Sequence, residues 1–495
     1  MRIATSIYIA LLLTVFLLAF PGDGYTGIQE FKHSLFLLIC GGYVITIAVL
    51  RVMYVITDTE PVGKIREKLR DIPIANKFLL GFLLATIISS VFSVHPGTFF
   101  GSFRYEGVLT IGIYILSCFF VSIYFRPQIW MLFLFGGVVG LSSILALIQL
   151  TGANPFTLYP EGFNYYDANV YYSGEFLSTI GNAGLFGAFL SLAVGILAMA
   201  FIKFDFKERW FLVLPFFIAV LLIFEMGIDA ALLALLVGFA LMFPIAVTSQ
   251  KTLANTLIVF AIITAAFGLS QALVFQDGPI LFASVNTTIF ITVGLISLFS
   301  IFIIKSSIFA KISTRQYRAG ATVIILSSIC FALITLWQYS GQPVGMIYEA
   351  SQVLRGNWDD DFGTGRVFIW RSVLEAIQWS TLLLGTGPDT LGYWGIYFSR
   401  YDEHLGVTLF ANTDAAHNEL LHILATGGLL SLLAYLGALL FAAVNWIRYP
   451  ENPISAVAGA GVLFYVIQAF FGISQSISAP FFWTCFAILL YTQKK

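Results

Sequence analysis

The chain has 495 residues, of which 59% are hydrophobic and 10% are charged, and its mean hydropathy is +0.91. Soluble domains carry about 25% charged residues, so the composition excludes an ordinary soluble protein and predicts an all-α, polytopic integral membrane protein. The formal net charge of −1 gives no sign of nucleic-acid binding. All four cysteines lie inside apolar runs, which favours small core residues over a disulfide framework or a metal site.

Fourteen apolar runs are candidates to cross a bilayer, for which a helix needs about 17 to 25 residues. In chain order they are 4–20, 33–56, 77–94, 107–125, 129–150, 180–202, 210–227, 229–247, 252–275, 280–304, 319–341, 412–444, 453–472 and 479–492. The first run follows a lone Arg2 and resembles a signal peptide, but no small-residue cleavage site follows it. We therefore interpret it as a helix.

The distribution of Lys and Arg predicts the orientation of these spans. With a cytoplasmic N-terminus, 19 of the 25 basic residues fall on the cytoplasmic side and six on the other. Because cytoplasmic loops are enriched in Lys and Arg, we expect both termini in the cytoplasm. Three segments then face outward: 95–107, 151–179 and the long loop 342–413.

The outer segment 151–179 mixes aromatic residues with carboxylates. The residues concerned are Tyr159, Phe163, Tyr165, Tyr166, Tyr171, Tyr172, Glu161, Asp167 and Glu175. Aromatic rings can stack on pyranose faces while carboxylates accept hydrogen bonds from hydroxyls, which suits sugar binding. An interfacial aromatic belt with a surface loop explains the same composition equally well.

The long outer loop 342–413 is predicted to contain an amphipathic helix. Thr364 can cap a helix over 366–379 whose apolar stripe lies along the membrane surface or against the bundle. The stripe is formed by Val367, Trp370, Val373, Leu374 and Ile377. Arg371 and Glu375 are spaced for an i,i+4 ion pair, and two glycines and a proline then break the helix at 384–389.

Arginines on the outer side are few, and the presence of each one can be explained in two ways. Arg104, Arg366 and Arg371 could bind the diphosphate head group of a lipid, because a guanidinium matches phosphate oxygens in a bidentate way. Alternatively each arginine pairs with a nearby carboxylate, such as Glu106 for Arg104 and Glu375 for Arg371.

His417 and Asn418 lie where the long loop enters the next span. A neutral imidazole can take a proton from a sugar hydroxyl, and Asp414 three residues earlier could orient the ring. The alternative is an interfacial histidine bonded to backbone. A metalloprotease motif is excluded, because His417 and His422 are five residues apart and so about 140° apart around a helix.

Three motifs together resemble the O-antigen ligase and O-antigen polymerase (Wzy-type) family of bacterial membrane glycosyltransferases. They are Arg366-Val-Phe-Ile-Trp370 followed by Leu384-Gly-Thr-Gly387, Ala416-His417-Asn418 running into Gly427-Gly428, and Ser178-Thr-Ile-Gly-Asn182-Ala-Gly184. The resemblance covers roughly residues 170–445. It divides the chain into N-terminal helices at 1–170, a ligase-like core at 171–445 and C-terminal helices at 446–495.

The resemblance implies transfer of a glycan from undecaprenyl diphosphate to an acceptor at the outer face of the bacterial cytoplasmic membrane, without a metal, nucleotide or other cofactor. It implies that His417 is the base that activates the acceptor hydroxyl and that Arg366 binds the diphosphate leaving group. Further candidate substrate-binding residues are Arg371, Arg104, Asn418, Asp414 and Asn182. The resemblance also implies a glycan or lipid-linked acceptor, and membrane lipids as further partners.

The chain departs from the family at the start of the span 229–247. The family usually has Ser-Arg-Gly here, and its arginine contributes to diphosphate binding, whereas this chain has Ile228-Asp229-Ala230. A carboxylate repels phosphate, so either Arg104 or Arg371 substitutes, or the donor is held differently. An inactive or divergent member is also compatible with this departure.

Other functions compete with glycan transfer by a ligase. A polymerase of the same family differs mainly in its acceptor. A flippase or transporter of lipid-linked glycans also suits fourteen spans, but transporters place charges near the membrane midplane. Here the mid-span regions are nearly free of charge and polar residues gather in outer loops, which favours chemistry at the surface. A non-catalytic membrane scaffold is the third alternative.

Overall fold

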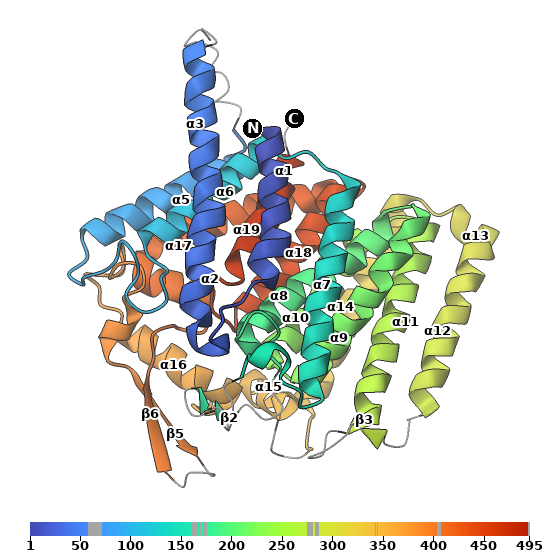
Figure 1. Cartoon of the computed structure of the whole chain (residues 1–495). Helices are drawn as coiled ribbons and strands as arrows, with labels where there is room; N and C mark the ends of the chain where they lie inside the picture. Colours follow the sequence, from blue (N-terminus) through green and yellow to red (C-terminus); the bar gives the residue numbers. More distant parts are fainter. Residues whose placement is uncertain are drawn as a thin grey trace.

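The computed structural model describes residues 1–57, 72–159, 166–167, 170–171, 176–274, 281–282, 287–341, 343, 345–402 and 407–493. Within these ranges, ten helices are long and apolar enough to cross a membrane, and four apolar helices are shorter. These helices correspond one to one to the fourteen predicted spans, which confirms the prediction of an all-α polytopic membrane protein (Figure 1). The predicted basic cluster at Lys64, Arg66, Lys68 and Arg70 lies outside the described residues.

The helices follow the chain in three groups. The first contains α1 (Arg2–Leu11), α2 (Ile28–Phe36), α3 (Gly42–Thr57), α5 (Ile74–Val91), α6 (Val108–Tyr124) and α7 (Ile129–Leu150), with π-helical turns η1 (Leu12–Phe16) and η3 (Leu37–Gly41). The second contains α8 (Ala183–Lys203), α9 (Val213–Met226), α10 (Asp229–Ala246), α11 (Gln250–Ala272), α12 (Thr287–Lys305), α13 (Ser307–Ala310) and α14 (Thr314–Trp337). The third contains α17 (Glu419–Arg448), α18 (Pro453–Ala469) and α19 (Ala479–Tyr491). Short 3-10 turns are η2 (Gly24–Gly27), η4 (Pro155–Thr157), η5 (Lys207–Leu212) and η6 (Leu391–Trp394).

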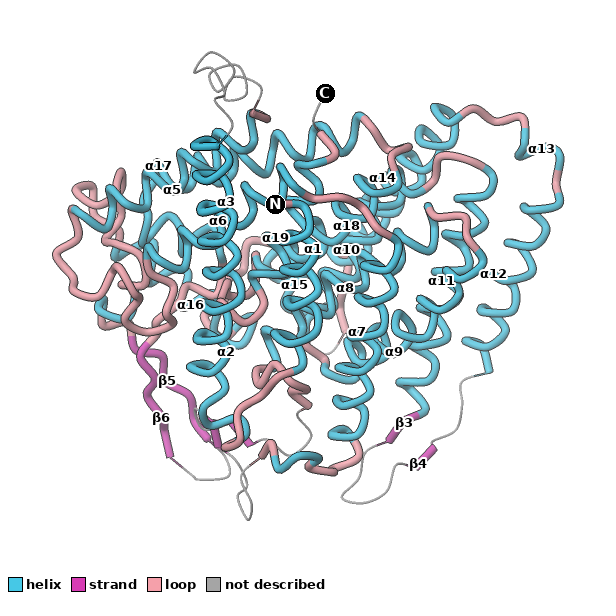
Figure 2. Tube along the Cα trace, turned by 45° about the horizontal axis from the view of Figure 1, so that its top comes forward, coloured by secondary structure: helices cyan, strands magenta, loops and turns pink. Residues whose placement is uncertain are grey.

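The centre of the bundle is α8, which is apolar on every side and almost wholly buried. A helix that is hydrophobic all round belongs in a core, and α9, α10 and α18 surround it. Along other edges α17 packs on α5 and α19 packs on α6. By contrast, α12 and α14 have mostly exposed apolar side chains, as suits helices that face lipid. Helix α12 lies at the edge of the bundle (Figure 2).

The two termini lie at one end of the bundle, and the long outer loop lies at the other (Figures 1 and 2). The loop contains two helices, α15 (Met346–Leu354) and α16 (Phe362–Ala376), and a hairpin of β5 (Tyr397–Asp402) and β6 (Val407–Asn412). The hairpin is antiparallel, with Tyr397 opposite Asn412 and Asp402 opposite Val407. The sequence analysis did not predict it. Two further hairpins pair β1 (Tyr166–Asp167) with β2 (Val170–Tyr171) and β3 (Leu273–Val274) with β4 (Leu281–Phe282).

The amphipathic helix of the outer loop is present as α16, but its start and end differ from the prediction. Gly363, Thr364 and Gly365 all have positive φ, so Thr364 lies in a left-handed turn instead of the extended conformation of a capping residue. The helix ends at Ala376 instead of Trp379. Val367, Ile369 and Val373 are its buried residues, whereas the predicted stripe member Leu374 is exposed.

The span predicted over 412–444 begins later and is interrupted. Asn418 caps α17 by accepting a hydrogen bond from the Leu421 backbone N–H at 3.0 Å, so residues 413–418 belong to the loop. Gly428 has φ 74° and ψ 179°, which breaks the helix into two parts. The predicted span therefore contains a short helical segment that carries His422, a break, and a longer transmembrane segment.

Candidate active site

The break in α17 is formed jointly by two glycine motifs that are about forty residues apart in the sequence. Gly387 N–H donates to the Thr426 carbonyl at 2.8 Å, and Leu429 N–H donates to the Leu382 carbonyl at 2.9 Å. The outer loop therefore satisfies backbone groups that the break would leave without partners. Such groups must be satisfied when they are shielded from water. Leu384-Gly-Thr-Gly387 and Gly427-Gly428 thus form one structural unit.

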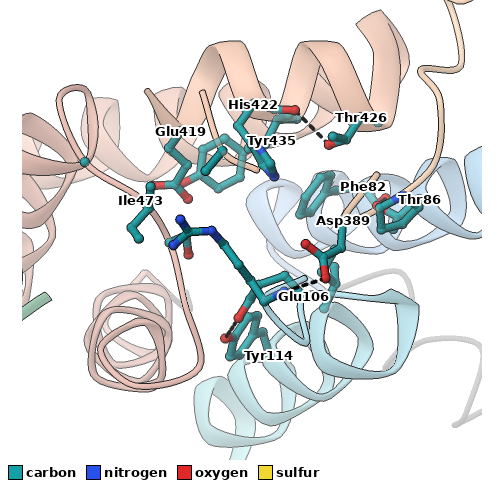
Figure 3. A pocket seen from close by; sticks show the side chains of 18 of the residues that line it. Phe82, Thr86, Glu106, Tyr114, Asp389, Glu419, His422, Thr426, Tyr435 and Ile473 are labelled. Atoms are coloured by element: carbon teal, nitrogen blue, oxygen red, sulfur yellow. Dashed lines mark hydrogen bonds between the residues drawn. The ribbon is translucent and has the colours of Figure 1, made fainter. Parts of the chain in front are cut away.

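A cavity of about 80 Å³ lies beside this break, at the junction of the bundle and the outer loops (Figure 3). The residues that line it include ionisable groups that lie far apart in the sequence. They are Arg104, Glu106, Asp389, His417, Glu419 and His422, with Phe82, Thr86, Tyr114, Tyr435 and Trp483 among the uncharged residues of the wall. The structure thereby joins the outer segment 95–107 to the long outer loop and to the start of α17.

The outer segment 95–107 is attached to the long loop by Asp389. Its carboxylate Oδ2 accepts hydrogen bonds from the backbone N–H groups of Phe103 at 2.9 Å and Arg104 at 2.8 Å. The Arg104 guanidinium in turn donates to Asp414 Oδ1 at 2.6 Å. Arg104 therefore pairs with a carboxylate, as the alternative explanation predicted, but with Asp414 and not with Glu106. This pairing places Arg104 directly beside the loop that carries His417.

His417 occupies a constrained position in the wall of the cavity. Its backbone φ is 48°, in the left-handed region that few non-glycine residues adopt. The preceding Ala416 is fully buried in a small apolar cluster with Ile369 and Val373 of α16. The packing of α16 therefore fixes the backbone from which the imidazole projects.

The electrostatic environment keeps the His417 imidazole neutral. Burial lowers the pKa of His417 to about 4, with further lowering by the charges of Arg104 and Arg366 and an opposing effect of Asp414. An imidazole with such a pKa is unprotonated at neutral pH, which a general base requires. No hydrogen bond joins Asp414 to the ring among the described residues, so Asp414 acts on it through charge.

Two buried carboxyl groups lie deeper in the cavity, and each is hydrogen-bonded to a tyrosine. Tyr114 donates to Glu106 Oε1 at 2.9 Å, and Tyr435 donates to Glu419 Oε1 at 3.0 Å (Figure 3). Burial raises the pKa of Glu106 to about 8, so this carboxyl group is mostly protonated at neutral pH. It therefore contributes no full negative charge to the cavity.

Arg366 lies in the first turn of α16 and faces acidic residues. One of its guanidinium nitrogens donates to the Gly363 carbonyl at 2.7 Å, whereas Nε is buried without a partner among the described residues. Burial lowers the pKa of Arg366, and the charges of Asp229 and Glu349 oppose this effect. Asp229, which replaces the arginine expected from the family, thus lies within electrostatic range of Arg366.

One turn after Arg366, Trp370 connects α16 to the bundle. Its ring lies 6.0 Å from the ring of Phe470 and 5.8 Å from that of Phe471, centroid to centroid, at the end of α18. Packing of large aromatic side chains contributes substantially to such contacts. The contact holds α16, and with it Arg366, against the end of α18.

Of the predicted site residues, Arg104 and His417 line the cavity, and the others, Arg366 included, do not. Arg371 is about half exposed and pairs with Asp360 at 3.0 Å, not with the predicted Glu375. Asn418 and Asn182 use their side-chain oxygens to cap α17 and α8, accepting from Leu421 and Leu185 at 3.0 Å. Most of the aromatic segment proposed for sugar binding, including Phe163, Tyr165 and Tyr172, lies outside the described residues.

Three of the seven non-glycine residues with positive φ in the described ranges lie at this cavity. Tyr105, Asp389 and His417 have φ of 60°, 56° and 48°, and all three lie in or next to its wall. Residues in left-handed conformations cost free energy and persist where the surrounding structure holds them, often at functional sites. The strain supports the assignment of the cavity as the candidate active site.

Sequence reasoning missed several members of the site. Asp389 was treated only as part of a turn, Glu106 only as a possible partner of Arg104, and His422 only as a rejected metal ligand. The turn motif Gly387-Pro388-Asp389 carried no signal for the site, because aspartate is a common turn residue and its contacts with residues 103 and 104 are distant in sequence. In the part of the chain that the structure describes, no group of three His, Cys, Asp or Glu residues is placed to hold a metal ion.

Comparison with known protein families identifies one match. Residues 274–436, which include Arg366, the glycine motifs and His417, match the family model described as O-antigen ligase. No curated protein matches the chain.

Proposed function

Because residues 274–436 match the family model described as O-antigen ligase, we propose that the chain transfers a glycan from undecaprenyl diphosphate to a hydroxyl group of an acceptor. The family acts in cell-surface polysaccharide assembly of the ligase or polymerase type. The proposed location is the bacterial cytoplasmic membrane, with both termini in the cytoplasm and the cavity toward the outer face. The shared end of the two termini and the excess of Lys and Arg there support this orientation.

The observation that carries the proposal is that His417, kept neutral by burial and by the charges of Arg104 and Arg366, lines a cavity at the junction of the bundle and the loop 342–413. His417 takes the proton of the acceptor hydroxyl, and the oxygen attacks the sugar C1. The bond from C1 to the phosphate oxygen breaks, and its electron pair leaves with the diphosphate. Arg366 binds that leaving group and stabilises the charge that develops on it. Interactions that are stronger in the transition state than with the bound substrate lower the activation barrier most.

In this chain, Asp229 and Arg104 change which cations are available to bind the diphosphate. The charge of Asp229 opposes phosphate binding near Arg366, whereas Arg104 already neutralises Asp414. The second cation for the diphosphate is therefore Arg104, through guanidinium nitrogens that the Asp414 contact leaves available. This assignment explains how the chain can bind the donor without the usual arginine at the start of α10.

The test uses purified protein in liposomes with a labelled undecaprenyl-diphosphate glycan and a sugar acceptor. We expect a product in which the glycan has left the diphosphate, formed at the same rate with and without a chelator. The variant Arg315→Ala, which changes an exposed arginine in the first turn of α14 and outside the cavity wall, should behave as wild type. A glycan that crosses the bilayer still attached to its lipid would contradict the proposal and support a transporter.

A further inference from the structure

The cavity beside His417 contains buried polar atoms whose hydrogen-bonding capacity is unused. Asp389 Oδ1, His422 Nδ1 and Arg104 Nε are buried and have no hydrogen-bond partner among the described residues. All three residues line the same cavity. Buried polar atoms are nearly always hydrogen-bonded, and leaving one unpaired costs about 1–3 kcal/mol. Arg104 is already assigned to the diphosphate, so the other two atoms, Asp389 Oδ1 and His422 Nδ1, indicate a second ligand that pairs with them.

Asp389 is the most firmly held of the three residues. Only 2% of it is exposed, and its Oδ2 accepts two backbone N–H groups from residues 103 and 104. The left-handed backbone at Asp389, with φ 56°, adds a further constraint on the side-chain direction. The free oxygen Oδ1 is thus a pre-positioned acceptor in the cavity wall.

His422 is similarly fixed by its place in the short segment of α17 before the break. Its carbonyl accepts the Thr426 hydroxyl at 2.7 Å, and its backbone N–H donates to the Asn418 carbonyl at 2.8 Å (Figure 3). The imidazole presents Nδ1 to the cavity wall without a partner. A neutral imidazole offers one donor and one acceptor nitrogen, so it can bind a hydroxyl in either direction.

The chemistry of these atoms selects a neutral polyhydroxyl ligand. A free carboxylate oxygen repels phosphate and accepts hydrogen bonds from hydroxyl groups. At about 80 Å³ the cavity is smaller than the ~300 Å³ or more of pockets that enclose a whole small molecule. It therefore suits the hydroxyl-bearing edge of a sugar whose remainder lies outside the cavity.

We propose that Asp389 and His422 form a binding subsite for two hydroxyl groups of the acceptor sugar. Asp389 Oδ1 accepts one hydroxyl, His422 Nδ1 pairs with a second, and together they direct the reacting hydroxyl toward His417. This inference rests on the proposed function and adds the residues that position the acceptor. Acceptor choice then depends on Asp389, which the outer loop contributes, as well as on the motif around His417.

The first test measures sugar binding without any reaction. The probes are octyl glucoside, octyl galactoside and octyl mannoside, added to protein in lipid nanodiscs while the fluorescence of the tryptophans, including Trp483 in the cavity wall, is recorded. We expect saturable binding of at least one probe by the wild type. Asp389→Asn and His422→Phe should each weaken that binding about tenfold or more, as for a lost hydrogen bond to a charged or buried group.

Asp389→Asn is a sharp test because it changes a single functional atom. The asparagine oxygen can still accept from the backbone of residues 103 and 104, while its amide nitrogen replaces the free acceptor with a donor. Asparagine also tolerates a left-handed backbone. The matched control is Asp359→Asn, which changes an exposed carboxylate of the same outer loop and should leave probe binding unchanged.

Monodeoxy analogues of the best probe complete the test. Wild type should bind one analogue about tenfold more weakly than the parent sugar, whereas Asp389→Asn should bind the two equally, because the partner of that hydroxyl is already lost. Equal probe affinities in wild type, Asp389→Asn and His422→Phe would overturn the inference, as would the absence of saturable binding. Glycan transfer by the wild type is scored separately, so the proposed function stands or fails on its own result.

Discussion

Gly385 and Gly428 meet so closely at the break in α17 that neither position has room for a side chain. A Cβ on Gly385 would overlap the Thr426 carbonyl, and a Cβ on Gly428 would overlap the Leu383 carbonyl and the Gly385 nitrogen. Both residues also have positive φ, 72° and 74°. The contact joins the outer loop to the transmembrane helix at the level of the cavity, and it explains why the two motifs are rich in glycine.

Substituting either glycine should therefore destabilise the protein and the site together. For Gly385→Ala and Gly428→Ala we expect the free energy of unfolding to fall by more than about 2 kcal/mol. The backbone atoms that the added Cβ would meet cannot move aside as a flexible side chain would. The control is Gly227→Ala, which also has positive φ, 60°, but no atom within 4 Å of the added Cβ. Its free energy of unfolding should fall only by the ~1–2 kcal/mol that a non-glycine residue costs in a left-handed conformation. Thermal unfolding in detergent measures all three, and equal losses would argue against the close contact.

The pH dependence of catalysis should reflect the depressed pKa of His417. Because this pKa is about 4, the imidazole stays neutral and able to accept a proton as the pH falls from 7 to 5. We expect kcat/KM, which reports the free enzyme, to show no inflection near 6.5. The fall of kcat/KM on the acid side of the pH profile should have its midpoint close to pH 4. Asp414→Asn removes a charge that raises this pKa, so the midpoint should move to still lower pH; movement to higher pH would contradict the electrostatic account.

Glu106 should make the protein less stable as the pH rises. Its pKa is about 8 in the folded protein and about 4.3 when unfolded. Between these values the unfolded chain releases a proton that the folded protein keeps, so stability falls from pH 4.3 to 8 and is constant above. Glu106→Gln imitates the protonated group and should gain melting temperature relative to wild type at pH 8 but not at pH 4. Glu208→Gln, at an exposed site, is the control; a gain independent of pH would be the contrary result.

Arg366 and Asp229 should affect donor binding in opposite directions. Arg366→Ala removes the cation assigned to the diphosphate, so the KM for the lipid-linked donor should rise about tenfold or more. Asp229→Asn removes a negative charge near that cation and should lower the donor KM. Arg315→Ala is the matched control for a lost exposed arginine. Donor kinetics at fixed acceptor concentration give all three values, and a higher donor KM in Asp229→Asn would contradict the placement of the diphosphate.

Much of the fold was predictable because long apolar runs have few alternatives in a membrane. The break in α17 and the loop hairpin were harder to predict. Gly428 interrupts the helix in the middle of a run of apolar residues, so hydrophobicity gives no sign of the break. Of the residues that line the cavity, the sequence predicted His417 and Arg104 as site residues. Asp389 is held in the cavity wall through contacts with residues about 285 positions away in the sequence, and no local pattern records such contacts.

The arginine partners were mispredicted for a similar reason. Nearness in sequence suggested Glu106 for Arg104 and Glu375 for Arg371, whereas the fold provides Asp414 and Asp360. An i,i+4 pair on an exposed helix contributes only about 0.2–0.5 kcal/mol. Tertiary packing can therefore replace it at little cost.

The central claim is that His417 accepts the proton of the acceptor hydroxyl, and the rate of glycan transfer by His417→Ala at pH 7 tests it most directly. The measurement uses saturating donor and acceptor, with His95→Ala as the control for a histidine outside the cavity wall. General base catalysis contributes about 10²–10⁴-fold, so we predict a transfer rate at least about 100-fold below wild type with donor KM unchanged. A transfer rate equal to that of wild type would contradict the account.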